Sequence, residues 1–322
     1  MIRLNKTTIF GIVIFVIMLF TGIGYAFLSS NLRISGTAGV AKRKIICKRA
    51  TYLHQQKCTA EDATMHYSCG VDGYTVNSSM IQFGKLGTQG NQLQAGDAFD
   101  CDVNGDGTYD GTYERFYYVT DLDTDNSYAV LIYYANIKNA NGDVDTGQRN
   151  ITYSGNYDTL TSGPIIARNE LVYNNDYGWK NVRLANTTRD ITDDTGKVYV
   201  KNFKYEDSNQ HIPRVTRLLT FKELVKACPL AQVSTGKKIK QGHCEFLVER
   251  TGYVSSEYSK GYWLEDVYPA TELEGTYNKA WVMDGKGLCS YPVFGRGHDD
   301  NDTSSQFGLR PVIEVKKGQM DY

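Results

Sequence analysis

The segment Tyr128-Ala-Val-Leu-Ile-Tyr-Tyr134, with residues 116–119 before it, carries the strongest strand signal in the chain. Its apolar residues do not alternate with polar ones, so both faces of the strand need cover, which predicts a central strand. The polar residues 121–127 between the two segments predict a turn that joins the strands.

A helix is predicted to begin at Thr220, where Thr220-Phe-Lys-Glu223 forms a capping box. The next apolar side chains have the spacing of one buried helix face: Phe221, Leu224, Val225 and Cys228. Pro229 then ends the helix, because proline lacks the amide hydrogen that a helix needs.

Three further strands are predicted, at residues 245–248, 280–283 and 309–315. Pro311 places the last of them at a sheet edge or at a bulge. The predicted order of elements is strands first, then one or two helices, then more strands. This order predicts an α+β fold of mostly antiparallel sheets with few helices.

Residues 9–28, IFGIVIFVIMLFTGIGYAFL, contain no charged side chain. About 20 helical residues span the ~30 Å hydrocarbon core of a bilayer, so the run predicts one N-terminal transmembrane helix. Arg3 and Lys6 precede it, and we expect the N-terminus inside and the C-terminal body outside the cell. The alternative is a signal peptide cleaved after Ala26, where Gly24-Tyr25-Ala26 fits a cleavage site, and the chain would then be secreted.

These boundaries divide the 322 residues into five parts. Residues 1–28 are the signal-anchor, 29–44 a stalk, 45–77 a small Cys-containing segment, 78–316 the main extracytoplasmic domain and 317–322 a tail. A net charge of −1 gives no electrostatic case for binding nucleic acid.

Seven cysteines in an exported chain imply disulfides and leave at least one thiol over. We favour Cys47–Cys58 and Cys228–Cys244, because each pairing closes a short loop. No Cys-x-x-Cys pair occurs, so a structural zinc site is not expected. The candidate disulfide cysteines are Cys47, Cys58, Cys69, Cys101, Cys228 and Cys244.

Short motifs in the second half of the chain carry a family resemblance. They are Arg217-Leu-Leu-Thr220, Tyr262-Trp263-Leu264, Ala280-Trp281-Val282 and Gly308-Leu-Arg310-Pro311. They resemble the C-type-lectin-like fold of sulfatase-modifying factors. More closely, the chain resembles an uncharacterised family of bacterial surface domains, through Ile81-Gln-Phe-Gly84, a helix with Trp179 and Arg183, and the closing Gly-x-Arg-Pro.

The resemblance implies a C-type-lectin-like fold over residues 78–316. The sulfatase-modifying enzymes use a paired-Cys copper site, and no cysteine pair here occupies an equivalent place, so their activity is not carried over. Structural roles are expected for Trp179, Trp263, Trp281 and Arg310. Arg310 lies in an apolar run, where it needs carbonyl or carboxylate partners; the alternative is a ligand-binding arginine.

Residues 102–114 match a calcium loop over its first nine positions. Oxygen-bearing side chains at positions 1, 3, 5 and 9, a carbonyl at 7 and glycine at 6 suit Ca²⁺, but position 12 is Tyr113 and the glutamate comes one residue later. The alternative is a plain Asx and glycine turn that binds no metal. The candidate ligands are Asp102, Asn104, Asp106, Thr108, Asp110 and Glu114.

A second acidic loop precedes the last strand and is either a ligand-binding loop or a solvated loop: His298, Asp299, Asp300 and Asp302. Tyrosine-, asparagine- and aspartate-rich loops on a rigid scaffold suit recognition. We therefore expect a membrane-anchored bacterial surface module for binding or adhesion, with a glycan or protein ligand and no catalytic residues. The alternatives are an extracytoplasmic enzyme of unknown reaction and a structural envelope protein.

Overall fold

The computed structural model describes Ile17 and residues 44–57, 70–71, 75–76, 80–147, 151–154, 162–176, 178–207, 209–228, 230–233, 236–239, 244–251, 261–268, 279–284, 287–293 and 306–322. The chain divides into two units, Met1–Arg43 and Lys44–Tyr322. Apart from Ile17, the first unit lies outside the described residues, and with it the predicted membrane-spanning run. No helix within the described ranges is long and apolar enough to cross a bilayer.

A six-stranded sheet contains the predicted central strand. Its strands are β1 (Cys47–Arg49), β6 (Ala98–Cys101), β7 (Arg115–Leu122), β8 (Asp125–Tyr133), β16 (Val312–Lys316) and β17 (Met320–Asp321). In the order β16-β8-β7-β6-β1-β17, all neighbours pair antiparallel except β1 and β17. Because β8 lies between β16 and β7, the central position predicted for residues 128–134 is confirmed.

The β7–β8 hairpin is longer than the sequence predicted. Leu122 pairs with Asp125, so the turn between the strands takes only two residues instead of seven. The polar residues at the start of β8 are exposed and continue the ladder, whereas residues 129–133 are buried. A strand that extends beyond the core at one end needs no apolar side chains there. The polar residues of this end were therefore assigned to the turn, and the predicted turn was too long.

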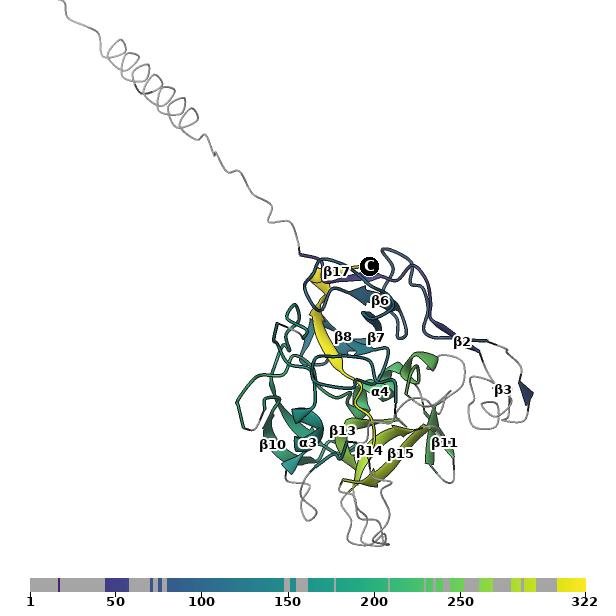
Figure 1. Ribbon diagram of the computed structural model, residues 1–322, viewed down its shortest axis with the longest axis vertical. Helices are drawn as coiled ribbons and strands as arrows, with labels where there is room; N and C mark the ends of the chain where they lie inside the picture. The colour runs from purple at the N-terminus through teal and green to yellow at the C-terminus, as the bar shows by residue number, and fades with distance from the viewer. Residues whose placement is uncertain are drawn as a thin grey trace, which may run out of the picture. The chain divides into compact units, whose positions relative to one another are not determined.

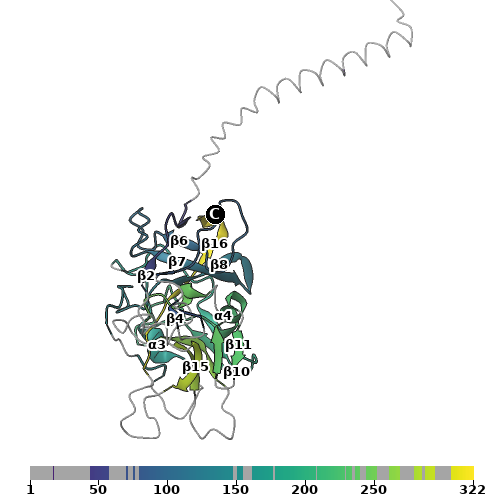
Figure 2. The ribbon, with the colours of Figure 1, turned by 90° about the vertical axis from the view of Figure 1, so that its right-hand side faces the viewer.

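A second sheet has five antiparallel strands in the order β11-β12-β15-β14-β13. These are β11 (Leu230–Val233), β12 (Gly236–Ile239), β13 (Tyr262–Tyr268), β14 (Lys279–Asp284) and β15 (Gly287–Pro292). Helix α4 (Phe221–Ala227) contacts both β7 and β13, and in Figures 1 and 2 it lies between the two sheets. Both hydrogen bonds of the predicted capping box are present at Thr220 and Glu223.

Smaller elements complete the described structure. Three two-stranded ribbons pair β2 (Gln55–Lys57) with β5 (Met80–Gln82), β3 (Gly70–Val71) with β4 (Thr75–Val76), and β9 (Thr188–Thr192) with β10 (Val198–Lys204). Helix α3 covers Ile165–Asn169, and two 3₁₀ turns cover Glu245–Leu247 and Lys317–Gln319. The described residues are therefore mostly β-sheet with two short α-helices, as the prediction of mostly antiparallel sheets required.

Two local predictions are wrong. The strand predicted at 245–248 is a 3₁₀ turn at Glu245–Leu247, because the amides of Leu247 and Val248 bond to the carbonyls of Cys244 and Glu245, three residues back in each case. The predicted helix around Trp179 is a series of turns, since the Trp179 ring packs edge-on against Phe116 and tertiary contacts replace helical ones. The strand predicted at 309–315 begins only at Val312, after Pro311, at the sheet edge that the proline indicated.

A buried ion network joins the two sheets to α4. Arg217 Nε donates to Glu314 on β16 over 2.6 Å, and its Nη2 donates to Glu223 on α4 over 2.6 Å. Arg189 bridges the same Glu314 (3.4 Å) and Glu265 on β13 (3.1 Å). Removing one partner of such a buried network leaves an uncompensated charge, so this network specifies how sheets and helix meet.

Candidate functional site

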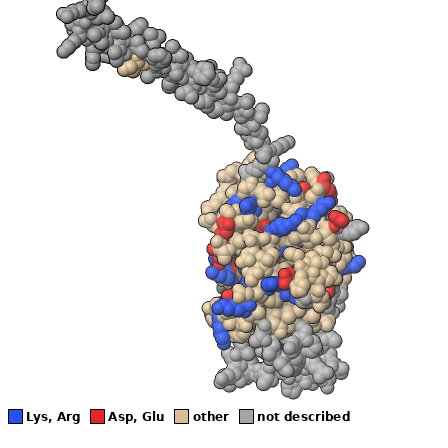
Figure 3. All heavy atoms as spheres, turned by 90° about the vertical axis from the view of Figure 1, so that its left-hand side faces the viewer, with Lys and Arg blue, Asp and Glu red and all other residues tan. Residues whose placement is uncertain are grey.

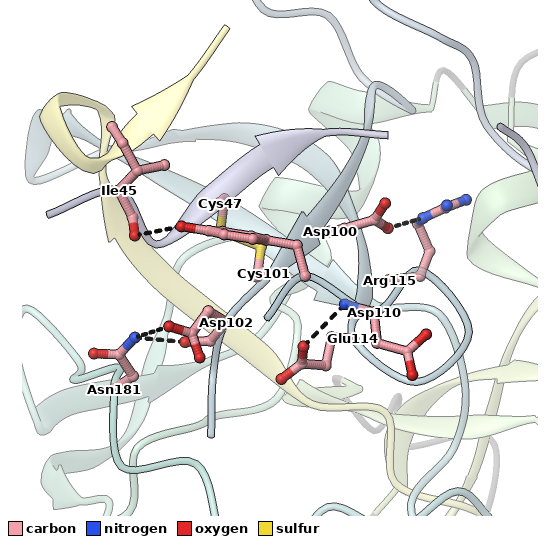
Figure 4. Close-up of a disulfide and its surroundings, with 10 residues drawn as sticks. Ile45, Cys47, Asp100, Cys101, Asp102, Asp110, Glu114, Arg115 and Asn181 are labelled. Atoms are coloured by element: carbon pink, nitrogen blue, oxygen red, sulfur yellow. Dashed lines mark hydrogen bonds and ion pairs between the residues drawn. A yellow bond between two sulfur atoms is a disulfide. The ribbon is translucent and has the colours of Figure 1, made fainter. Parts of the chain in front are cut away.

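The disulfide Cys47–Cys101 ties β1 to β6 beside the predicted calcium loop (Figure 4). The pairing of Cys47 with Cys58 is therefore wrong. Cys47 faces Cys101 in the antiparallel register, with 4.0 Å between their Cα atoms across 54 residues of chain, and sequence spacing does not reveal such a neighbour. The predicted disulfide Cys228–Cys244 is confirmed. Cys58 and Cys69 lie outside the described residues.

The first half of the calcium-like loop is a chain of Asx turns. Asn104 Oδ1 accepts the amide of Asp106 (2.9 Å), and Asp106 Oδ1 accepts the amide and hydroxyl of Thr108 (2.7 and 2.6 Å). The bonds from Thr108 lower the pKa of the exposed Asp106. Gly105 and Gly107 have φ of 76° and 85°, which lets the chain turn this tightly.

Asp102 and Glu114, at the two ends of the loop, are instead buried. Asn181 Nδ2 donates to Asp102 Oδ2 over 3.2 Å, and the amide of Asp110 donates to Glu114 Oε2 over 3.2 Å. Burial raises the pKa of Glu114 to about 7, and the charges of Asp106 and Asp102 act in the same direction. The loop thus places two carboxyl groups where water does not reach them.

The predicted ligands are therefore only partly brought together. Figure 4 shows Asp102 and Glu114 on the same side of the disulfide, whereas the carboxylate of Asp110 points away and Asp110 Oδ1 accepts the amide of Thr112 (2.8 Å). Asp106, Thr108 and Asp110 are exposed. Within the described ranges, no three His, Cys, Asp or Glu side chains are grouped closely enough to hold a metal ion.

Two exposed tyrosines flank the turn that follows this loop. Tyr113 is 63% exposed and Tyr52 is 47% exposed, and no other tyrosine, tryptophan or phenylalanine in the described part of the chain is exposed to this degree. A Cβ at Gly111 would lie 2.8 Å from the Tyr52 hydroxyl and 2.8 Å from Arg115 Nη2, so a larger residue there would push the ends of these two side chains aside. The Arg115 guanidinium lies under the Tyr52 ring, 4.9 Å from its centroid.

Beneath the tyrosines lies a hydrogen-bonded trio of His54, Glu249 and Tyr117. His54 Nδ1 lies 2.5 Å from Glu249 Oε1, and Tyr117 donates its hydroxyl to Glu249 Oε2 over 2.5 Å. His54 Nε2 lies 2.6 Å from the carbonyl of Gly111, which only accepts, so Nε2 carries the hydrogen. With both nitrogens engaged, the imidazole has no lone pair to offer a substrate, and it pins the Gly111 turn.

Sequence reasoning missed this trio. His54 and Glu249 lie 195 residues apart, and neither stands in a recognisable motif. The backbone marks the region in one place, because Arg250, next to Glu249, adopts a φ of 45°, which is unusual for a residue with a side chain. The Arg250 guanidinium lies 5.5 Å from the centroid of the Tyr134 ring, and that ring contacts His54.

The residues expected to have structural roles are buried: Trp179, Trp263, Trp281 and Arg310. Arg310 Nε donates to the carbonyl of Tyr133 (2.5 Å), and its Nη2 donates to the carbonyl of Phe246. These bonds link Arg310, two residues before β16, to β8 and to the 3₁₀ turn at Glu245–Leu247. The acidic loop of His298, Asp299, Asp300 and Asp302 lies outside the described residues.

Two other surface features give weaker evidence for ligand binding. A pocket of about 230 Å³ near the C-terminus includes Tyr118, Asp121, Lys317 and Tyr322. This pocket is smaller than typical ligand pockets, which have volumes of roughly 300–1,000 Å³. The Asp121 carboxylate in it already pairs with Lys317 and accepts a hydrogen bond from the Tyr118 hydroxyl. On the face in Figure 3, basic and acidic side chains are interspersed among uncharged residues, which does not resemble a nucleic-acid surface.

Comparison of the chain with protein-family models, curated proteins and solved structures found no match. The two disulfides indicate an oxidising, extracytoplasmic location, because such bonds persist where thiols are not kept reduced.

Proposed function

We propose that this chain is a membrane-anchored, extracytoplasmic binding module of a bacterial surface, and that it holds a glycan on Tyr52 and Tyr113. The observation that carries the proposal is that the two exposed aromatic side chains of the described residues flank one turn. The apolar face of a sugar ring stacks on an aromatic ring, while its hydroxyl groups need polar neighbours. Tyrosine offers both properties at a small cost in side-chain entropy.

The rigidity of the turn favours recognition. The Gly111 carbonyl accepts a bond from His54, and the Tyr113 carbonyl accepts one from the Tyr133 hydroxyl over 2.5 Å. The backbone on both sides of Thr112 is therefore held by side chains of the body, the partly buried His54 and the buried Tyr133. A binding surface that is already ordered loses less conformational entropy when its ligand arrives.

A small ligand fits this surface better than a protein does. Stable protein interfaces bury about 800 Å² on each partner and have an apolar centre. The other exposed large apolar side chains among the described residues of the body are Met80, Leu86 and Val198, which come from separate segments. Two exposed tyrosines beside hydrogen-bonding groups offer the kinds of contact that a sugar needs.

Catalysis at this surface has less support. A general base needs a free lone pair within reach of the substrate. Gly111 and Glu249 occupy both nitrogens of His54, and the Tyr117 hydroxyl and His54 occupy the two oxygens of Glu249. An enzymatic role would require the Gly111 turn to move away first.

The membrane anchor and the C-type-lectin-like fold belong to the same proposal. The apolar run of residues 9–28 supports the anchor. The fold rests on the Trp-containing strands β13 and β14 and on the closing Gly-x-Arg-Pro, whose arginine is buried against neighbouring carbonyls. Protease treatment of intact cells should remove the body and spare cytoplasmic proteins; protection of the C-terminus would contradict this topology.

A glycan array probed with the full chain in detergent tests the function. We expect selective binding that Tyr113→Ala weakens at least about tenfold, because truncating a central aromatic contact usually costs more than 1 kcal/mol. Val198→Ala, which shortens another exposed apolar side chain, on the β9–β10 ribbon, is the control and should bind as wild type does.

Three results would contradict the proposal. They are an array without binding, binding that Tyr113→Ala leaves unchanged, and mass-spectrometric detection of shortened glycans, which would indicate an enzyme. Tyr113→Ala should keep the melting temperature of wild type because the ring is largely exposed, so a loss of binding is separable from unfolding.

A further inference from the structure

Asp102 and Glu114 share an unusual arrangement of hydrogen bonds. In each carboxylate one oxygen is held by a protein donor, Asn181 for Asp102 Oδ2 and the amide of Asp110 for Glu114 Oε2. The other oxygen, Asp102 Oδ1 or Glu114 Oε1, is buried and accepts no hydrogen bond from the described residues, although the backbone N–H of Asn104 also lies near the Glu114 carboxylate. Donors that hold one oxygen orient the other, as supporting groups do around metal ligands.

A buried carboxylate oxygen without a partner is costly. Transfer of an ionised carboxylate out of water costs several kcal/mol unless a cation or hydrogen bonds compensate. Both residues are 5% exposed, and neither forms an ion pair with any described lysine, arginine or histidine. Basic side chains beside the loop contact other groups: the Lys180 side chain packs against Gly105, and Lys48 Nζ lies 4.0 Å from the centroid of the Tyr109 ring.

We propose that a calcium ion binds between Asp102 and Glu114, and that oxygens of the intervening loop complete its coordination. Ca²⁺ takes six to eight oxygen ligands in flexible geometry, and two carboxylates supply up to four of them. Asn104, backbone carbonyls and water are the remaining oxygen sources that this loop offers. Mg²⁺ demands stricter octahedral geometry and is reluctant to lose its waters, so the site should prefer Ca²⁺.

The number of carboxylates at the site also sets its expected affinity for Ca²⁺. Sites with few carboxylates bind weakly, and extracellular modules commonly have dissociation constants of about 10⁻⁴–10⁻³ M. Glu114 follows Tyr113 directly and holds the amide of Asp110 at the start of the Gly111 turn. Calcium on Glu114 would therefore order the turn that carries Tyr113. This inference does not depend on glycan binding, and either proposal can fail alone.

Thermal unfolding of the full chain in detergent, after removal of metal with EDTA and dialysis, tests the site with CaCl₂ as the probe. We expect about 10 mM CaCl₂ to raise the melting temperature by about 2–5 °C, saturating in the low millimolar range. The same concentration of MgCl₂ should give less than half of this shift. Asp102→Asn combined with Glu114→Gln, which keeps both shapes and removes both charges, should abolish the response.

Asp125→Asn is the matched control. Asp125 is also an Asx-turn aspartate, whose Oδ1 accepts the Ser127 amide over 2.9 Å, but it is exposed. The variant should respond to CaCl₂ as wild type does. Loss of the response in Asp125→Asn, its persistence in the double variant, or its absence in wild type would each overturn the proposal.

A second measurement keeps the proposal testable if the double variant does not fold. Terbium luminescence excited through tyrosine should appear on wild type, because Tyr109 and Tyr113 lie within the loop, and CaCl₂ should displace it. Absence of this signal, or a signal that CaCl₂ does not displace, would also overturn the calcium site.

Discussion

The two disulfides of the described residues close loops of very different length, which makes their removal a quantitative test. Cys47–Cys101 spans 54 residues and Cys228–Cys244 spans 16. In the chain-entropy model, the stabilisation grows with the logarithm of loop length, which gives about 4 kcal/mol for the first and about 3 kcal/mol for the second. Removing the first disulfide should therefore lower the free energy of unfolding by about 1 kcal/mol more than removing the second.

The perturbation is to change each pair to alanine in turn. All four cysteines are at most 5% exposed, so the cost of the cavities left by the sulfur atoms is similar in both variants and largely cancels. What remains in the difference is the constraint on the unfolded chain. We expect the variant without Cys47–Cys101 to be the less stable one by about 1 kcal/mol.

Denaturant unfolding of the oxidised full chain in detergent measures this difference through the midpoint and slope of each transition. Equal slopes are required, since a changed slope would mean that the surface exposed on unfolding had changed. A larger loss for the Cys228–Cys244 pair would refute the loop-length reasoning. A loss below about 1 kcal/mol in both variants would show that these cross-links do not stabilise the fold by constraining the unfolded chain.

Three further predictions concern buried charges. Arg310→Leu should cost about 1–3 kcal/mol of unfolding free energy, because two buried carbonyls lose their donor, and an unchanged melting temperature would contradict this. Arg217→Met should cost about 3–5 kcal/mol, because it leaves the buried Glu223 without its ion-pair partner and Glu314 with only the longer contact to Arg189. The control Lys222→Met removes an exposed ion pair and should cost at most about 1 kcal/mol; equal losses would refute the distinction. Burial raises the pKa of Asp266 to about 8, and the charge of the neighbouring Glu265 acts in the same direction. The folded state therefore keeps a proton on Asp266 that the unfolded chain releases near pH 4. As a result, Asp266 lowers the free energy of unfolding as pH rises from about 4 toward 8. Asp266→Asn should flatten that dependence in denaturant titrations between pH 5 and 9, and an unchanged slope would show that Asp266 is ionised throughout.

Local sequence signals were enough for several elements. The apolar run of residues 128–134 indicated a central strand because cover on both faces requires apolar side chains on both faces. The capping box at Thr220 and Glu223 indicated where α4 begins because its two hydrogen bonds lie within four residues. The Cys228–Cys244 pair followed from short spacing, since chain entropy favours close partners.

Only the tertiary structure decided the partners that lie far apart in the chain. Cys47 meets Cys101 through strand register, and His54 meets Glu249 across 195 residues. The same holds for the candidate calcium loop: its residue types are written in the sequence, but burial of Asp102 and Glu114 and exposure of Asp106 follow from how β6, β7 and the segment at Asn181 pack. The physical reason is that periodicity and capping act over one or two turns of chain, whereas burial and pairing depend on which faces the whole fold brings together.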